Sequence, residues 1–177
     1  MEFQQTNNVE PTEISMEIPK KPKWTPPPPG VIKINCDAAF DHVSRKASIA
    51  AVFRENSSSC LHGISAPCWA PSADVAESYA IKLGLLNAKK CAFSKVIIES
   101  DSKAVINRLN SGVPSDLVTS AIEESIKILA KEFESCCFSF VSRSCNQLAD
   151  WLAKSAKSEQ DQVIWDPSIL PAHLLYS

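Results

Sequence analysis

Four carboxylic acids stand at positions where the surrounding sequence is apolar or built of small residues. Asp37 interrupts the apolar stretch VIKINCDAAF, and Asp101 directly follows the apolar run KVIIES. Glu77 lies among small residues of a helical segment, and Asp150 lies within the segment LADWL. Burying any one of these acids as an anion without a partner costs several kcal/mol. The need for charged residues on a protein surface therefore does not explain why these four acids occur at apolar positions.

Convergence of the four acids on divalent cations would remove this cost. Carboxylate oxygens are the hard ligands that Mg²⁺ prefers, and the charge of the ion offsets the repulsion between the acids. Two such ions about 3.5 to 4 Å apart can activate a water molecule and stabilise the leaving oxygen of a phosphodiester. We therefore interpret the four acids together as a candidate magnesium site.

Each acid taken alone also has an ordinary structural interpretation. Asp37 could end a strand in a turn, and Asp101 could be the N-cap of the helix that follows it. Glu77 could be a capping-box acid or a solvated residue, and Asp150 could be a surface acid of a helix. The joint interpretation is favoured because all four lie at strand ends or on helix faces expected to point inward.

Composition predicts one globular domain with little electrostatic bias. The 177 residues carry 18 Lys+Arg against 20 Asp+Glu, which excludes a polybasic nucleic-acid binder of the histone type. No uncharged apolar run approaches the roughly 20 residues that cross a bilayer, so a membrane protein is not expected. The N-terminal residues show neither a signal-peptide pattern nor a transit-peptide pattern. We therefore expect an intracellular protein, cytoplasmic or nuclear, that acts as a monomer.

Seven cysteines occur without a repeated C-x-x-C spacing or a neighbouring pair of histidines. An odd number without metal-ligand spacing is typical of a reduced, intracellular protein. Several of these cysteines lie in apolar runs, where a free thiol behaves as a small hydrophobic side chain. We expect them to contribute to the core rather than to bind zinc.

Prolines divide the chain into regions, because seven of the 12 prolines precede Gly30. Residues 1–23 are expected to form a disordered tail, and residues 24–30 an extended proline-rich spacer that leads into a strand. A ligand for a proline-recognition module is the alternative for that spacer. Residues 31–158 are predicted to form the folded domain. Residues 159–177 are expected to be a C-terminal tail, which either packs on the sheet or is a remnant.

Hydrophobic periodicity predicts an α/β fold in the order of three strands, a helix, a strand, helices, a strand and a helix. Strands in direct succession form an antiparallel meander, whereas strands separated by helices form parallel crossovers. The expected architecture is therefore a mixed five-stranded sheet with helices packed on both faces. The strands are expected at residues 31–40, 48–55, 60–66, 95–100 and 136–142, with the main helices at residues 73–91, 118–133 and 146–157.

The helical segment at residues 73–91 should approach the sheet closely. Ser72 can cap this helix. Small residues recur on one helical face at spacings of three and four, and small side chains allow close packing on a sheet. Because Glu77 lies within this stripe, it is expected to face inward. The stripe consists of Ala73, Ala76, Glu77, Ala80, Gly84, Ala88 and Cys91.

Four motifs follow one another along the chain in a characteristic order. They are W-x-P-P-P-x-G-x-x-K-x-N-x-D at residues 24–37 with one extra proline, A-E-x-x-A at residues 76–80, E-S-D-S at residues 99–102 and R-x-x-N-x-x-A-D-x-L-A at residues 143–153. On these motifs the chain, over about residues 24–157, resembles the reverse-transcriptase-like branch of the ribonuclease H superfamily. This branch is abundant in plants and often descends from retroelements.

The resemblance implies a ribonuclease H-like fold and a nuclease activity. Such proteins use two Mg²⁺ ions, or Mn²⁺, to cut the RNA strand of an RNA–DNA hybrid, leaving 5′-phosphate and 3′-hydroxyl ends. By position, the metal-binding acids of the family fall on Asp37, Glu77, Asp101 and Asp150. The resemblance implies that Asp37 bridges both ions and that Glu77 and Asp101 share the ion on the leaving-group side. Asp150 would then hold the ion that positions the attacking water.

Two further residues of the last motif are candidate substrate-binding residues. Asn146 lies four residues before Asp150, hence one turn away on the same helix face, and could orient the substrate or a water molecule. Arg143, in the preceding loop, either contacts a phosphate or caps the end of the strand.

Three departures from the family pattern concern the approach of a nucleic acid. Ala38 follows the first acid where the family commonly has glycine, and Ala50 and Ala51 lie in the second strand where glycine is also common. Glycine permits the close approach of another strand, which makes Ala38 a candidate substrate contact. The segment SRSCNQ lacks the loop histidine that aids product release in hybrid nucleases. From Val31 onward 15 Lys+Arg face 16 Asp+Glu, so nonspecific affinity for nucleic acid should be modest.

Two functions from different classes therefore remain. The four acids favour a metal-dependent endoribonuclease acting on RNA–DNA hybrids. The missing glycines favour a catalytically weak or inactive domain that is retained for binding nucleic acid or protein. An exonuclease with four acids is a weaker third possibility, because three strands followed by a helix fit a hybrid nuclease better.

Overall fold

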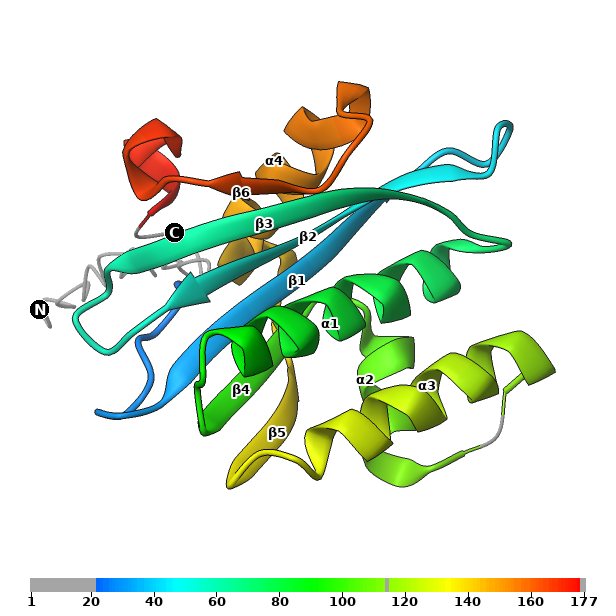
Figure 1. Cartoon of the computed structure of the whole chain (residues 1–177), viewed down its shortest axis with the longest axis horizontal. Coiled ribbons are helices and arrows are strands. Elements are labelled where there is room, and N and C mark those ends of the chain that lie inside the picture. Colours follow the sequence, from blue (N-terminus) through cyan, green and yellow to red (C-terminus); the bar gives the residue numbers. More distant parts are fainter. Residues whose placement is uncertain (1–21, 114, 176–177) are drawn as a thin grey trace, which may run out of the picture.

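A computed structural model of the chain describes residues 22–113 and 115–175, and the tail expected at residues 1–23 lies almost wholly outside this range. Within it the chain forms a six-stranded sheet with helices on both faces (Figure 1). The strands are β1 (Ile32–Phe40), β2 (Lys46–Arg54), β3 (Cys60–Trp69), β4 (Lys95–Ser100), β5 (Ser135–Phe140) and β6 (Val163–Trp165). The helices are α1 (Ala73–Lys90), α2 (Lys103–Ser111), α3 (Leu117–Ala130) and α4 (Gln147–Ser155).

The sheet has the strand order β5–β4–β1–β2–β3–β6. β1, β2 and β3 pair as an antiparallel meander, and β4 and β5 run parallel to β1 after their helical connections. The predicted mixed α/β fold is thereby confirmed, with its meander and its parallel crossovers. The physical basis is local, because short polar turns join the first three strands whereas helices separate the later ones.

The predicted count of five strands is wrong by one, because the segment expected as a C-terminal tail contributes a sixth. β6 pairs antiparallel with β3, and Ile164 lies opposite Ile64. The indole N–H of Trp165 donates a hydrogen bond of 2.8 Å to the hydroxyl oxygen of Ser65. A strand of three residues is too short to show alternation in the sequence. Its formation depends on the open edge that β3 offers.

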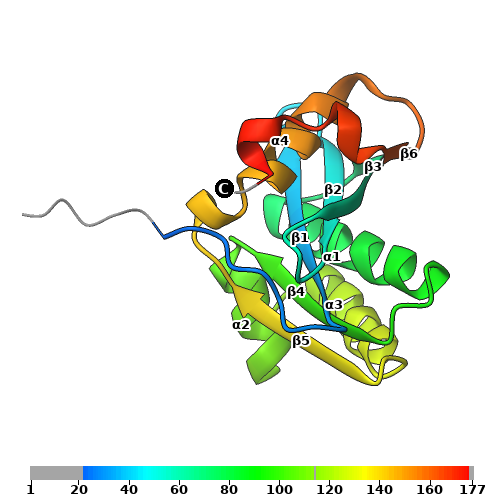
Figure 2. The same cartoon turned by 90° about the vertical axis from the view of Figure 1, so that its left-hand side faces the viewer.

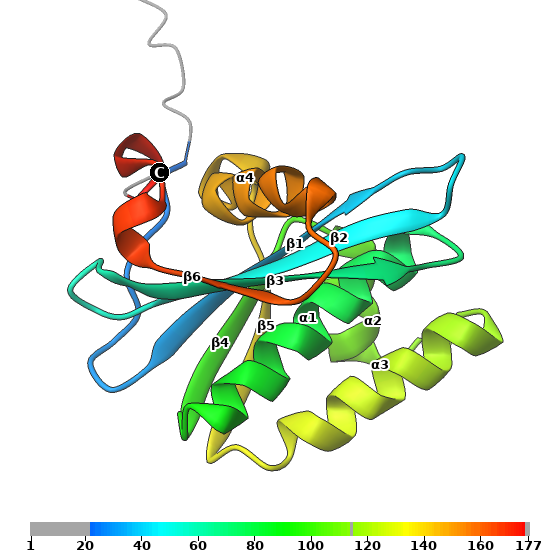
Figure 3. The same ribbon diagram turned by 45° about the horizontal axis from the view of Figure 1, so that its top comes forward.

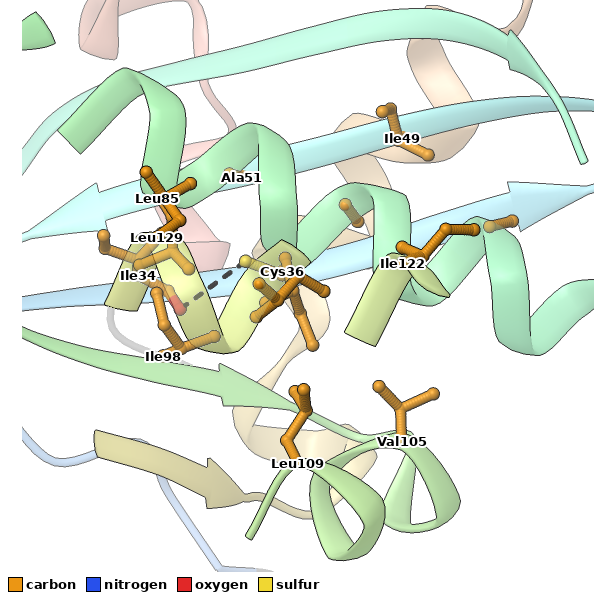
Figure 4. Close-up of a cluster of buried hydrophobic side chains, with 14 of the residues drawn as sticks. Ile34, Cys36, Ile49, Ala51, Leu85, Ile98, Val105, Leu109, Ile122 and Leu129 are labelled. Atoms are coloured by element: carbon orange, nitrogen blue, oxygen red, sulfur yellow. Dashed lines mark hydrogen bonds between the residues drawn. The ribbon is translucent and has the colours of Figure 1, made fainter. Parts of the chain in front are cut away.

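Helices cover the two faces of the sheet unequally. α1, α2 and α3 pack on one face, and α4 packs on the other (Figures 1 and 3). Along β1 the side chains alternate between these faces, so Ile34 and Cys36 join the core beneath α1 (Figure 4). Asn35 and Asp37 point to the face that carries α4. One strand therefore supplies core residues to one side and polar residues to the other.

Close packing of α1 on β1 depends on its small residues. A methyl group built at Gly84 would lie 3.0 Å from Cγ2 of Ile34 and 3.1 Å from Sγ of Cys36. Ser72 caps the helix as predicted, accepting a hydrogen bond from the backbone N–H of Val75. The predicted stripe is buried along its middle and exposed at Ala73 and Cys91, where the chain enters and leaves the helix.

Two further expectations concern the cysteines and the membrane. Cys36 and Cys145 are buried, Cys91 and Cys137 are exposed, and all seven cysteines are free thiols. Among the described residues, none of the helices combines the length and apolarity that a membrane span requires.

Candidate metal centre

The register between β1 and β4 brings Asp37 and Asp101 together. The two strands pair in parallel up to Cys36, which lies opposite Ser100. Asp37 and Asp101 are the next residues along each strand. Because β4 ends at Ser100, Asp37 is the first residue of β1 without a partner there. Carboxyl ends of parallel strands commonly border a ligand-binding crevice, and these two acids stand at that border.

Glu77, in the second turn of α1, completes a group of three carboxylates. One oxygen from each of Asp37, Glu77 and Asp101 lies within 4.8 Å of the other two. Oε2 of Glu77 is buried and has no hydrogen-bond partner. A buried carboxylate oxygen without a donor, next to two further carboxylates, fits a divalent cation, which prefers hard oxygen ligands. The inward orientation that the sequence predicts for Glu77 is confirmed.

Electrostatics at this group disfavour three simultaneous negative charges. Burial and the charges of Asp101 and Asp150 raise the pKa of Asp37 to about 8, against an ordinary value of 3.8. Burial and the charges of Asp37 and Asp101 hold the pKa of Glu77 well above its ordinary value. Burial also raises the pKa of Asp101, although Arg143 acts in the opposite direction. A bound cation would reverse these shifts, because it stabilises the ionised carboxylates.

Asp150 stands at the border of this group rather than within it. Oδ2 of Asp150 lies 2.6 Å from Nζ of Lys154, and its Oδ1 lies 3.3 Å from Nη2 of Arg143. Burial by itself raises the pKa of Asp150, but the hydrogen bonds and charges of Lys154 and Arg143 outweigh it and lower that pKa. In the described part of the chain, the compact acidic group thus holds three of the four acids, and Asp150 is neutralised by cationic side chains.

Arg143 and Asn146 occupy different surroundings, although both belong to one motif. The side chain of Arg143, in the 3₁₀ helix η1 (Arg143–Cys145), is 74% exposed and spans the gap between Asp150 and Asp101, whose Oδ2 lies 3.9 Å from Nε. Asn146 is fully buried and donates through Nδ2 to the carbonyl oxygen of Cys36 at 2.9 Å. Arg143 is therefore available to a ligand, whereas Asn146 ties the start of α4 to β1.

The alanines at the family's glycine positions are not equivalent. Ala50 and Ala51 are fully buried in β2, so their methyl groups cannot contact a substrate. Ala38 is half-buried, and its backbone N–H acts against burial by lowering the pKa values of Asp37 and Glu77. Only Ala38 of the three stands next to the candidate metal site.

Two polar residues near the site were not identified as functional candidates from the sequence. Asn35 and Glu99 are buried and lie opposite each other in the β1–β4 register. Nδ2 of Asn35 donates to Oε2 of Glu99 at 2.9 Å. The available signal was their spacing, because each stands two residues before an acid of the site and so on the same face of the sheet.

Comparison with known proteins gives a family and a fold. A family model described as "Reverse transcriptase-like" matches residues 35–156. No curated protein sequence matches the chain. RNase H1 from the halophilic archaeon Halobacterium salinarum NRC-1 superposes with a TM-score of 0.67 at 19% identity, covering 71% of this chain and 96% of that one.

Two further solved structures have the same fold. The N-terminal RNase H domain of Rv2228c from Mycobacterium tuberculosis gives a TM-score of 0.66 at 22% identity, covering 72% of this chain and 93% of that one. LC11-RNase H1, isolated from compost and solved in complex with an RNA/DNA hybrid, gives 0.65 at 19% identity, covering 70% and 94%. With the family match spanning more than half of its residues, this chain belongs to the reverse transcriptase-like family and has the ribonuclease H-like fold.

Proposed function

We propose that this protein is a divalent-metal-dependent endoribonuclease that cuts the RNA strand of RNA–DNA hybrids. The observation that carries the proposal is the group formed by Asp37, Glu77 and Asp101, whose oxygens lie within 4.8 Å of one another at the end of β4. The family match and the fold support it, as does the complex of LC11-RNase H1 with an RNA/DNA hybrid.

In this proposal the acids hold two Mg²⁺ or Mn²⁺ ions. Asp37, Glu77 and Asp101 would hold one ion, and Asp150 together with Asp37 would hold the second. The ions supply Lewis acidity, which activates water and stabilises the leaving oxygen of a phosphodiester. Asp150 is accessible for this role because its cationic partners are exposed side chains that can turn to solvent.

The remaining side chains of the site position the substrate. Arg143 extends from the border of the acidic group, where its guanidinium can donate to a phosphate oxygen. Ala38 directly follows Asp37 along β1, and its backbone N–H favours the ionised forms of Asp37 and Glu77 by lowering their pKa values. Asn146 acts from within the protein by holding the helix that carries Asp150.

A catalytically weak or inactive domain that binds nucleic acid or protein is the second candidate. The observation that favours it is Ala38, which directly follows Asp37 at a position where the family commonly has glycine. It predicts binding of a hybrid without cleavage.

A cleavage assay decides between these functions. The full chain is incubated with an RNA–DNA hybrid labelled in the RNA strand, in Mg²⁺ and separately in Mn²⁺. We expect internal cuts that leave 5′-phosphate and 3′-hydroxyl ends, and no cutting of RNA–RNA or DNA–DNA duplexes. A circular RNA strand annealed to DNA separates an endonuclease, which cuts it, from an exonuclease, which does not.

The matched variants are Asp37→Asn and Asp161→Asn. Loss of the Asp37 carboxylate should lower the cleavage rate by about 10³-fold, because several kcal/mol of metal-dependent stabilisation of the transition state are removed. Asp161 is exposed in the loop before β6, so its variant should retain the wild-type rate. Binding of the hybrid by wild-type protein without cleavage in either ion would favour the second candidate.

A further inference from the structure

A layer of hydrogen-bonded polar side chains lies directly beneath the candidate metal centre. Asn35 and Glu99 face each other across β1 and β4, two residues before Asp37 and Asp101 on the same face of the sheet. Two residues along a strand correspond to about 6.6 Å. On that face of the sheet, the Asn35–Glu99 pair is thus the residue pair nearest to the two acids.

Both carboxylate oxygens of Glu99 are held in fixed directions. Oε2 accepts from the indole Nε1–H of Trp24 at 2.9 Å and from Nδ2 of Asn35 at the same distance. Oε1 lies 2.7 Å from Nζ of Lys33. The Trp24 ring is itself covered by the guanidinium of Arg54, whose Cζ lies 4.2 Å from the ring centroid. Glu99 is only 3% exposed and Trp24 only 7%, so water does not replace these contacts.

The same layer continues to the helix that carries Asp150. Nδ2 of Asn35 lies 3.3 Å from Oδ1 of Asn146, and Asn146 donates to the carbonyl oxygen of Cys36, the residue before Asp37. Asn146 also precedes Asp150 by one helical turn. A chain of hydrogen bonds therefore joins Trp24 to the backbone at Asp37 and to the start of α4.

The segment around Trp24 also contacts the loop that carries Arg143. The carbonyl oxygen of Pro22 accepts from the hydroxyl of Ser144 at 2.8 Å and from the thiol of Cys145 at 3.4 Å. Figure 2 shows this segment, in dark blue, running alongside the sheet before it enters β1. It precedes residue 35, where the match to the family model begins.

We propose that Trp24 is a positioning residue of the metal centre, acting through Glu99, Asn35 and Asn146 to fix the acids relative to one another. This inference rests on the proposed metal-dependent function. Ligands of a metal site must be held within about 0.5 Å, and partners behind the ligands supply that constraint. Without the indole donor, Oε2 of Glu99 accepts a hydrogen bond from Asn35 only. The acceptor that orients Asn35, and through Asn35 also Asn146, is then held by one donor fewer.

The test compares two variants that each remove one hydrogen-bonding indole, the buried Trp24 or the partly buried Trp165. Trp24→Phe removes the donor to Glu99 and keeps an aromatic ring under Arg54. Trp165→Phe is the matched control, because its indole donates to Ser65, away from the acids. Binding of Mn²⁺ to each full-length protein is measured by calorimetry, and unfolding is followed in parallel by thermal melting. Neither variant changes the charge of the protein, so a difference in affinity does not arise from net charge.

We expect Trp24→Phe to weaken Mn²⁺ binding by about tenfold, the lower end of the range for partners behind metal ligands, with little change for Trp165→Phe. Partial unfolding lowers the number of sites rather than the affinity of the folded ones. Asn35→Ser is a second neutral variant in the same layer and should weaken binding in the same direction, which keeps the test decisive should Trp24→Phe not fold. Wild-type Mn²⁺ affinity in the folded Trp24→Phe protein, or an equal loss in both tryptophan variants, overturns the proposal.

A failure of the proposed nuclease function can be distinguished from a failure of the role proposed for Trp24. If wild-type protein binds Mn²⁺ but cleaves no hybrid, the nuclease proposal fails, while the comparison of Mn²⁺ affinities still decides the role of Trp24. If the protein is a nuclease, the Mg²⁺ concentration for half-maximal cleavage should rise in Trp24→Phe, and excess Mg²⁺ should restore the rate. An unchanged Mg²⁺ midpoint with a lower maximal rate contradicts a positioning role.

Discussion

At the scale of single residues, Asp37 has the most constrained electrostatic surroundings of the candidate site. It is 5% exposed and lies beside Glu77 and Asp101, and the backbone N–H of Ala38 lowers its pKa only in part. Burial removes the solvation of its charged form, and the neighbouring acids add repulsion. In metal-free protein the charged form of Asp37 is therefore disfavoured, and a bound cation would offset this cost.

Because the charged form of Asp37 is disfavoured in the folded protein, the free energy of unfolding should depend on pH. The folded-state pKa of Asp37, about 8, is raised above its ordinary value of 3.8. Its contribution to the free energy of unfolding is therefore full below about pH 4 and is lost as pH rises toward and through pH 8. Urea unfolding of metal-free protein across this window measures it. Asp37→Asn should gain relative to wild type as pH rises from 4 to 8, by several kcal/mol in total, because each unit of pKa shift corresponds to about 1.4 kcal/mol.

The comparison with Asp161→Asn isolates this effect from general changes in charge. Asp161 is exposed, so its variant should follow the wild-type curve. Added Mg²⁺ should abolish the advantage of Asp37→Asn, since the cation stabilises the wild-type carboxylates. A constant difference between Asp37→Asn and wild type from pH 4 to pH 8 contradicts the assignment.

At the scale of secondary structure elements, the position of Glu77 depends on how closely α1 approaches β1. Gly84, two turns after Glu77, leaves little room for a side chain, since a Cβ would lie 3.0 Å from Cγ2 of Ile34, which would have to shift. The predicted stripe of small residues thus has a structural and a functional consequence. It lets the helix pack closely on the sheet, and it places the carboxylate of Glu77 beside those of Asp37 and Asp101.

The substitution Gly84→Val should move α1 away from β1. The added side chain overlaps Ile34 and Cys36, so we expect a loss of about 2 to 3 kcal/mol in the free energy of unfolding. Because the helix must move away from β1, Mn²⁺ affinity should fall as well. Urea unfolding and calorimetric Mn²⁺ titration measure the two effects.

Lys90→Val is the control for a valine in α1, because Lys90 is exposed at the end of the helix. It should alter neither the core nor the metal site. Unchanged stability of Gly84→Val relative to this control would show that the helix accommodates the side chain without moving.

At the scale of the whole molecule, the charge balance limits how the protein can hold a nucleic acid. From Val31 onward the 15 Lys+Arg nearly cancel the 16 Asp+Glu, and Arg143 and Lys154 are already engaged with Asp150. A protein with this charge balance neutralises few phosphates of a bound nucleic acid. Its affinity for a hybrid should depend on local contacts rather than on a broad basic surface.

The salt dependence of hybrid binding tests this expectation. Binding is measured by fluorescence anisotropy with Asp37→Asn protein, which does not cut the substrate under the proposed function. The slope of log Kobs against log salt concentration should be shallower than about −3, because each neutralised phosphate contributes about −0.9. A slope steeper than about −5 would reveal a basic surface that the charge balance does not predict.

The chain shows where prediction from sequence succeeds and where it fails. Periodicity over neighbouring residues predicts the meander of β1, β2 and β3. It also predicts the capped helix α1 and the inward orientation of Glu77. Asp37 and Asp101 were identified because an acid at the end of an apolar strand is costly to bury. β6 was missed because three residues carry no periodicity, and its pairing depends on β3, about 100 positions earlier.

By itself, then, the sequence determined the order of the elements and the acids that stand at their ends, because local spacing controls both. Only the tertiary structure decided which acids meet. The register of Cys36 with Ser100 brings Asp37 and Asp101 together, and the packing of α1 adds Glu77, whereas Asp150 pairs with Lys154 and Arg143. It also decided that Trp24 hydrogen-bonds Glu99, 75 positions away. Contacts at such separation depend on strand pairing and packing, which the spacing of neighbouring residues does not encode.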